Sequence, residues 1–135
     1  MPRSRIQGLL ESHGILPTPQ RLEVAEILLD RPQHLSAEQI IDTLKERDSG
    51  VSKATVYNTL NLFSERGLVK ELMVDPERKF YDSTTRPHHH FYNVDTRVLT
   101  DIDDAAIEFL SLPELPEGTE QTSVEVLIKV RGRQA

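Results

Sequence analysis

The sequence predicts an α+β protein with a helical first part and a strand-rich second part. Apolar residues recur at helical spacing through the first half of the chain, whereas residues 124–130 alternate between apolar and polar side chains. A polar segment that ends in proline, residues 83–87, lies between the two patterns. We therefore expect a first domain over 1–83, a hinge over 84–87 and a second domain over 88–135.

The composition excludes several classes of protein. The chain has 135 residues, 37% hydrophobic and 28% charged, which fits one or two small domains and excludes a large enzyme. No apolar run approaches the ~20 residues of a membrane span, and the first residues lead into no secretory segment, so we expect a cytoplasmic protein. The absence of cysteine excludes disulfides and thiolate-bound zinc. The net charge of −6 argues against a generally basic surface but leaves room for a local basic patch.

Three short helices are expected before residue 50. The first ends at Gly14, which suits a helix stop. The second begins where Thr18, an N-cap, precedes Pro19. Ser36 and Gln39 form a capping box that opens the third helix.

A fourth helix over residues 52–64 is followed by two strands. Val56, Leu60 and Phe63 give this helix an apolar face. Residues 68–74 and 78–81 have the pattern of two strands joined by a tight turn. Short helices followed by a small hairpin are typical of a winged helix-turn-helix domain.

The other face of this fourth helix suits DNA recognition. A recognition helix needs short polar side chains that reach phosphates and base edges in the major groove. Ser52, Lys53, Thr55 and Tyr57 can bond phosphates, and Asn58 can read a base edge. A capped surface helix with a half-buried tyrosine is the alternative, because polar helix faces are common.

The second domain is predicted to contain few elements. Residues 91–94 and 98–101 read as a hairpin, residues 105–110 as a short helix that Pro113 ends, and residues 124–130 as a long strand. A module of about 45 residues can hardly bury enough apolar surface alone. We therefore expect this domain to pair with a second copy and form a homodimer.

Histidines and carboxylates near the hinge suggest a metal site. On a strand, His88 and His90 point to the same face, so their imidazoles can approach one ion. Asp82, Asp101 and His34 are candidates to complete the site. Nitrogen and oxygen donors without sulfur suit Mn(II), Fe(II), Co(II) or Zn(II) rather than Cu(I).

Other interpretations of these histidines stay open. They can be hydrogen-bonded structural residues with no ion, or His88, His89 and His90 can supply an axial ligand to haem. A small metallohydrolase is a third class, but the sequence has no phosphate-binding glycine loop and no nucleophile elbow. We expect a protein without enzymatic activity.

Several motifs resemble, in order and spacing, those of the ferric uptake regulator family. The motifs are Leu9-Leu10-Glu11-Ser12-His13-Gly14-Ile15, Pro19-Gln20-Arg21, His34-Leu35-Ser36-Ala37-Glu38, Ala54-Thr55-Val56-Tyr57-Asn58-Thr59-Leu60, Gly67-Leu68-Val69 and His88-His89-His90. The resemblance covers residues 4 to about 104 and is looser beyond. It implies a cytoplasmic, dimeric, metal-responsive repressor with a winged-helix DNA-binding domain and a dimerisation and metal-sensing domain. Its partners would be a double-stranded DNA operator and a second copy, with no membrane.

Within the family, the chain resembles the peroxide regulator and iron response regulator branches more closely than the ferric uptake regulator proper. Asp82 and the Asn58 that follows Tyr57 resemble the peroxide regulator, and the His88-His89-His90 run with Leu115-Pro116-Glu117-Gly118 resembles the iron response regulator. The resemblance implies a regulatory site that binds Fe(II) or Mn(II), with Zn(II) as an alternative. Its ligands would be His34, Asp82, His88, His90 and Asp101. In peroxide-sensing relatives the counterparts of His34 and His88 are oxidised, and in iron response relatives the three-histidine run is associated with haem.

Two features depart from the family pattern. The paired Cys-x-x-Cys motifs that hold a structural zinc in many relatives are absent, so no structural four-cysteine zinc is expected. Leu16 replaces a basic residue that reaches the minor groove in some members, and Arg21 or Arg3 is the candidate to take its place. The resulting hypothesis is a clamp, in which one ion bonded from both sides of the hinge sets the angle between the two reading helices of a dimer.

Overall fold

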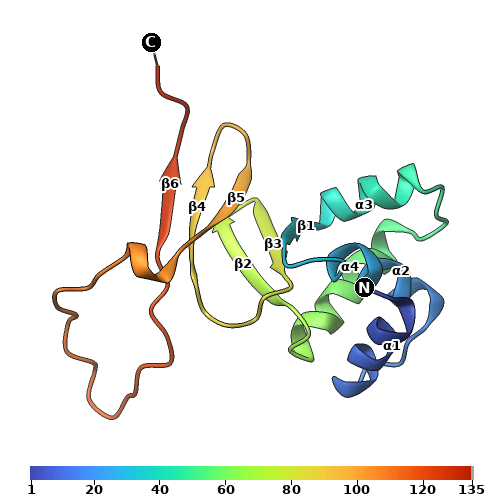
Figure 1. Ribbon diagram of the computed structural model, residues 1–135, viewed down its shortest axis with the longest axis horizontal. Helices are drawn as coiled ribbons and strands as arrows, with labels where there is room; N and C mark the ends of the chain where they lie inside the picture. Colours follow the sequence, from blue (N-terminus) through green and yellow to red (C-terminus); the bar gives the residue numbers. More distant parts are fainter. Residues whose placement is uncertain (135) are drawn as a thin grey trace. The chain divides into compact units, whose positions relative to one another are not determined.

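The computed structural model describes residues 1–134, which form two compact units (Figure 1). The first unit spans Met1–Thr85, and the second begins at Arg86. Within the described residues the first unit holds four α-helices and a three-stranded sheet, and the second holds another three-stranded sheet. The predicted α+β class is therefore confirmed.

The four predicted helices of the first unit are present, with the predicted caps. They are α1 (Arg3–Ser12), α2 (Pro19–Leu28), α3 (Ala37–Glu46) and α4 (Lys53–Glu65). The Thr18 hydroxyl accepts from the Arg21 backbone N–H, the Ser52 hydroxyl accepts from that of Thr55, and Ser36 forms a complete capping box with Gln39. These side chains satisfy N–H groups that have no partner inside the first helical turn.

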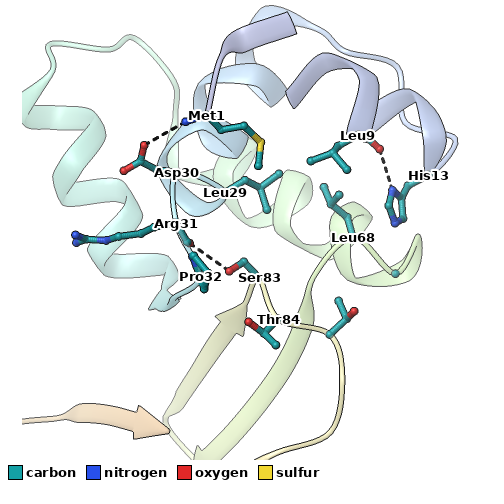
Figure 2. A pocket seen from close by; sticks show the side chains of 12 residues that line it. Met1, Leu9, His13, Leu29, Asp30, Arg31, Pro32, Leu68, Ser83 and Thr84 are labelled. Atoms are coloured by element: carbon teal, nitrogen blue, oxygen red, sulfur yellow. Dashed lines mark hydrogen bonds and ion pairs between the residues drawn. The ribbon is translucent and has the colours of Figure 1, made fainter. Parts of the chain in front are cut away.

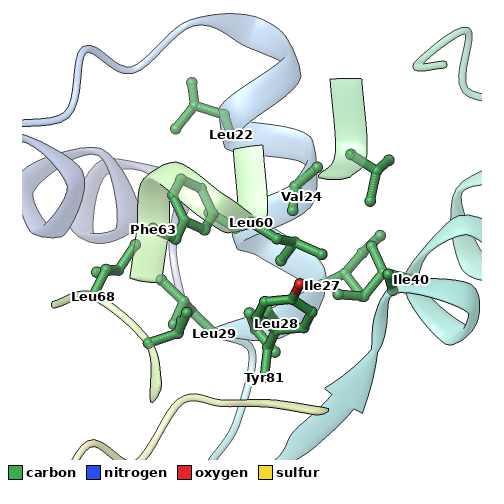
Figure 3. Close-up of a cluster of buried hydrophobic side chains, with 14 of the residues drawn as sticks. Leu22, Val24, Ile27, Leu28, Leu29, Ile40, Leu60, Phe63, Leu68 and Tyr81 are labelled. Atoms are coloured by element: carbon green, nitrogen blue, oxygen red, sulfur yellow. The ribbon is translucent and has the colours of Figure 1, made fainter. Parts of the chain in front are cut away.

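Helix α4 is held on the unit by its apolar face. Val56, Leu60 and Phe63 are fully buried, and Figure 3 shows Leu60 and Phe63 close to α2 residues such as Val24 and Leu28. Burial of one such side chain contributes about 1.5–3 kcal/mol. The opposite, polar face of α4 is consequently fixed in position while it remains open to solvent.

The hairpin after α4 pairs with a short strand that the sequence did not predict. Strands β2 (Lys70–Asp75) and β3 (Arg78–Asp82) form the hairpin, and β1 (His34–Ser36) pairs antiparallel with the other edge of β3. Three residues are too few to show an alternating pattern, which explains why β1 was missed. The first unit has the helix order and terminal hairpin of a winged helix-turn-helix domain.

The second unit is built on a mixed sheet in the order β5-β4-β6. Strands β4 (His89–Asn93) and β5 (Val98–Ile102) form the predicted hairpin, and β6 (Leu127–Val130) lies parallel to β4. The Asn93 side chain accepts from the backbone N–H groups of Asp95 and Thr96 and so closes the turn.

Two predictions for the second unit are wrong. The helix expected over 105–110 is a single 3-10 turn, η1 (Asp104–Ala106), and the Leu110 side chain is fully exposed. A short helix needs an apolar face packed on its unit, and this one lacks that support. The strand expected over 124–130 is shortened to β6, although the Val126 carbonyl still accepts from the His90 N–H. No helix among residues 1–134 is long and apolar enough to cross a membrane.

Candidate metal centre and nucleic-acid interface

Three of the predicted ligands come together in the second unit. The register of the hairpin places His90 directly opposite Asp101, and His88 precedes β4 on the same face. The Asp101 Oδ1 atom lies 3.1 Å from His88 Nε2 and 3.3 Å from His90 Nε2. The centroids of the two imidazole rings are 4.2 Å apart. Two ring nitrogens thus converge on one carboxylate oxygen.

The tautomer of His88 is set by its second ring nitrogen. Nδ1 lies 2.8 Å from the Arg86 carbonyl oxygen, which can only accept, so Nδ1 carries a proton and donates it. In the neutral ring Nε2 is left with a lone pair that faces the Asp101 carboxylate. Two acceptors at this distance repel each other unless a proton or a cation stands between them. A backbone carbonyl on the far nitrogen is the usual support of a metal-binding histidine.

Burial and spacing also suit an ion at this cluster. His88 and His90 are 5% and 4% exposed, whereas the Asp101 side chain is 61% exposed. The ligand atoms of these three residues lie within 4.8 Å of one another, so small side-chain rotations can reach metal bonds of about 2.0–2.2 Å. An ion can therefore enter from the Asp101 side and bind buried imidazoles. Three ligands leave further coordination positions for other donors.

His89 lies on the opposite face of β4 and has a structural contact. Its Nδ1 accepts from the Val126 N–H at 2.9 Å, so in the neutral ring the proton is on Nε2. The ring also meets Phe109 edge-on, with centroids 6.0 Å apart. In this tautomer neither nitrogen offers a lone pair to an ion or to haem iron, and the ring ties the segment before β6 to β4.

The first unit contains a second histidine–aspartate pair. His34 on β1 lies directly opposite Asp82 on β3, and Asp82 is almost fully buried. Asp82 Oδ1 accepts from the Thr84 N–H at 2.8 Å. The neighbouring residues lock these strands together, because Gln33 and Ser83 exchange backbone and hydroxyl hydrogen bonds. The Asp82 carboxylate and the backbone of His34 are thus held at the end of the sheet.

A cavity of ≈ 350 Å³ lies in the first unit beside α1 (Figure 2). Leu9, Leu29 and Leu68 give it apolar walls, and the Ser83 hydroxyl at its edge donates to the Arg31 carbonyl.

The ring of His13 is bonded to the Leu9 carbonyl through Nδ1 at 2.8 Å. His13 is therefore bonded at the C-terminal end of its own helix, α1.

Most of the predicted DNA-contacting side chains lie on α4 or at its N-cap, and Arg21 lies on the neighbouring helix α2. Lys53 and Asn58 are exposed, and Thr55 is half-buried. Arg21 and Asn58 line a hollow of ≈ 270 Å³ together with Thr55. The Arg21 guanidinium donates to the Leu16 carbonyl at 3.0 Å, which holds it at this hollow. The Ser52 hydroxyl is occupied as the N-cap and by Thr55 Oγ1, so its exposed contribution is the helix N-terminus itself.

Tyr57, in contrast, is hydrogen-bonded to Glu38, a residue of α3. Its hydroxyl donates to Glu38 Oε1 at 3.2 Å, and its ring is 41% exposed. Partial burial, followed by the charge of Glu38 and the hydrogen bond to it, raises the pKa of Tyr57. Nothing in the local sequence indicates this pair, because α3 and α4 meet only through tertiary packing.

The fold and the site define a class of protein. It is a winged-helix protein with a second, sheet-containing unit that carries a cluster of imidazole and carboxylate groups able to bind a metal ion. The chain belongs to the ferric uptake regulator family, whose family model matches residues 12–128. Among solved structures it is similar to the ferric uptake regulator from Pseudomonas aeruginosa with manganese. That match has a TM-score of 0.71 and 26% identity and covers 95% of this chain and 98% of the other.

Two curated bacterial relatives are similar to part of the chain. The peroxide operon regulator of Bacillus subtilis (strain 168) is 38% identical over 81 residues, which are 60% of this chain and 56% of the relative. The ferric uptake regulation protein of Synechococcus elongatus is 36% identical over 89 residues, which are 63% of this chain and 60% of the relative. The matched segments therefore span somewhat more than half the length of these relatives.

Proposed function

We propose that this protein is a metal-responsive, DNA-binding transcriptional regulator that acts as a repressor and has no enzymatic activity. The observation that carries the proposal is the convergence of His88 and His90 on Asp101 Oδ1, with His88 Nδ1 directed to the Arg86 carbonyl. Membership of the ferric uptake regulator family and the polar face of α4 support the DNA-binding part. Its site of action is the cytoplasm, where a bacterium keeps its operator DNA.

The ion is Fe(II) or Mn(II), with Zn(II) as the alternative. Imidazole and carboxylate donors without sulfur favour these ions over Cu(I). The similar Pseudomonas aeruginosa structure is of a regulator with manganese, and the Bacillus subtilis relative is a peroxide operon regulator. Fe(II) at this site would extend the response to peroxide. Haem has less support than a single ion, because His89 Nδ1 accepts from the Val126 N–H and Nε2 then carries the ring proton.

The ion is proposed to act as a clamp between the two units. His34 and Asp82 would contribute donors from the first unit, and His88, His90 and Asp101 would contribute donors from the second. Such an ion favours one angle between the units by its difference in affinity for the two arrangements. In a homodimer this angle decides whether both α4 helices reach their half-sites together.

An exposed apolar sheet face supports the dimer. Phe91, Val98, Ile128 and Val130 remain 37–51% exposed on β4, β5 and β6. The register of the sheet places Phe91 beside Ile128 and places Asn93 between Val98 and Val130, so these side chains share one face. A second copy that covers this face would bury the apolar surface that one small unit leaves exposed.

Calorimetric titration of Mn(II) tests the metal site. We expect His88→Ala and His90→Ala to weaken Mn(II) binding by at least about tenfold, since each removes a ligand. The control is His13→Ala, because this ring is bonded within its own helix. Equal Mn(II) affinity in the wild type and both ligand variants would contradict the proposal.

A mobility-shift assay at one ionic strength tests the link between ion and DNA. We expect operator binding by the wild type to require Mn(II) or Fe(II) and to be lost with chelator. The operator affinity of the His88→Ala variant should change neither with the metal ion nor with chelator. DNA binding that ignores chelator would instead favour a winged-helix protein without a metal switch. Turnover of a substrate that chelator abolishes would favour a metallohydrolase.

A further inference from the structure

The hydroxyl of Tyr57 is directed by a carboxylate from another helix. Tyr57 lies on the exposed face of α4, and Glu38 lies in the first turn of α3. The phenol donates to Glu38 Oε1 at 3.2 Å. Both side chains line a polar hollow of ≈ 360 Å³ between α3, α4 and the β2–β3 hairpin, together with Asn61 and Lys79.

The direction of this hydrogen bond decides what Tyr57 can offer to DNA. A phenol has a single proton to donate, and its oxygen can also accept. While the proton is directed to Glu38, the hydroxyl cannot donate to a phosphate oxygen, but its lone pairs remain available to an N–H donor. The raised pKa of Tyr57, caused first by burial and then by Glu38, keeps the phenol protonated at neutral pH.

The charge of Glu38 has a second effect on DNA. The Lys79 ammonium at the same hollow pairs with Glu71, 3.3 Å away, so it is directed to another carboxylate. Glu38 therefore presents negative charge beside the reading helix, where it repels phosphates of any sequence.

We propose that Glu38 is a specificity-determining residue that turns Tyr57 from a phosphate donor into an acceptor for a base amino group. In the major groove such groups are N6 of adenine and N4 of cytosine. The Tyr57–Glu38 pair thus favours adenine or cytosine where the hydroxyl meets the base edge. The charge of Glu38 lowers the affinity for non-specific DNA. This inference rests on the proposed function, because it assumes that α4 reads DNA.

The test compares operator DNA with non-specific DNA for full-length variants loaded with Mn(II). The operator is first selected from random-sequence DNA by the wild-type protein, and all affinities are measured at one salt concentration. We expect Glu38→Ala to raise non-specific affinity about two- to fivefold and to lower the ratio of operator to non-specific affinity about tenfold. Glu38→Gln removes the charge but keeps an acceptor for Tyr57, so it should raise non-specific affinity and hold the ratio.

Two controls separate the pair from a general charge effect. Glu46→Gln removes an exposed charge at the other end of α3 and should leave the ratio unchanged. Tyr57→Phe should lower the ratio by itself and add little to Glu38→Ala, since both remove the same contact. A Glu38→Ala ratio equal to the wild-type ratio, or an equal change in Glu46→Gln, would overturn the inference.

Base analogues identify the group that is read. Operators in which one adenine is replaced by purine, or one cytosine by pyrimidin-2-one, lack single amino groups. We expect one such replacement to weaken binding of the wild type but not of Tyr57→Phe. If no replacement distinguishes the two proteins, the inference fails while the proposed function stands. If the wild type selects no sequence with or without Mn(II), both fail.

Discussion

At the scale of single residues, hydrogen bonds rather than residue types decide the roles of the polar side chains. His88 and His89 are neighbours of the same type, but the first donates through Nδ1 to the Arg86 carbonyl and the second accepts at Nδ1 from the Val126 N–H. His88 can therefore offer Nε2 to an ion, whereas His89 ties the segment before β6 to β4. The sequence predicts alternation along the strand but not these tautomers.

Tyr81 gives a prediction at this scale. Burial, followed by the charge of Glu71 and then by Tyr57 and Glu38, raises the pKa of Tyr81 from 10.0 to about 12. The unfolded chain then loses this proton at lower pH than the folded protein. The contribution to stability is complete below pH 10 and is lost as the pH rises toward 12.

This prediction is checked by chemical denaturation at several alkaline pH values. The free energy of unfolding should fall across this window in the wild type and fall less steeply in Tyr81→Phe. Tyr92→Phe is a comparison in the second unit, since Tyr92 is also buried. The same decline in Tyr81→Phe and the wild type would show that Tyr81 titrates normally.

At the scale of secondary structure, helix ends were predictable and unsupported elements were not. Thr18, Ser36 and Ser52 each bond a backbone N–H three residues ahead, a contact that is visible in the sequence. The predicted helix over 105–110 failed because its apolar residues stay largely exposed: Leu110 is fully exposed, and Phe109 contacts the His89 ring only edge-on, which the sequence does not show. Strand β1 was missed because its pairing with β3 depends on residues about 46 positions away.

The capping box of α3 gives a prediction for an element. Ser36 is fully buried, accepts from the Gln39 N–H, and receives the Gln39 side chain on its own N–H. We expect Ser36→Ala to lower the free energy of unfolding by about 1 kcal/mol, and by no more than about 2 kcal/mol. Urea denaturation measures this loss.

Ser4→Ala is the matched control, because Ser4 is an exposed residue within the first turn of α1. It should change stability by less than about 0.5 kcal/mol. If Ser36→Ala is as stable as Ser4→Ala, the capping box does not hold the start of α3.

At the scale of the whole molecule, neither unit alone contains all the parts of the proposed function. The first unit holds a histidine–aspartate pair and the proposed DNA-reading helix α4, and the second holds a three-residue donor cluster and an exposed apolar sheet face. The proposed ion would join the donors, and the proposed second copy would cover the face. The predicted hinge over 84–87 stays a prediction.

The dimer gives a prediction at this scale. Val98 lies on the apolar sheet face and is 51% exposed. A lysine there would place a charge within the proposed interface, so we expect Val98→Lys to weaken the dimer by at least about tenfold. Sedimentation equilibrium measures the dissociation constant.

Val94→Lys is the control, because Val94 is 44% exposed but lies in the turn after Asn93, outside the strands that carry the apolar face. It should dimerise like the wild type. Equal weakening by both substitutions, or by neither, would place the interface elsewhere.

The sequence by itself determined the four helices of the first unit, the hairpins and the chemistry of the donors, since caps, turns and periodicity act over three or four residues. Only the tertiary structure decided that Asp101 meets His88 and His90, that His89 faces away, and that Glu38 accepts the hydrogen bond of the Tyr57 hydroxyl. These contacts join residues far apart in the chain, and their geometry follows from strand register and helix packing, which no local pattern encodes.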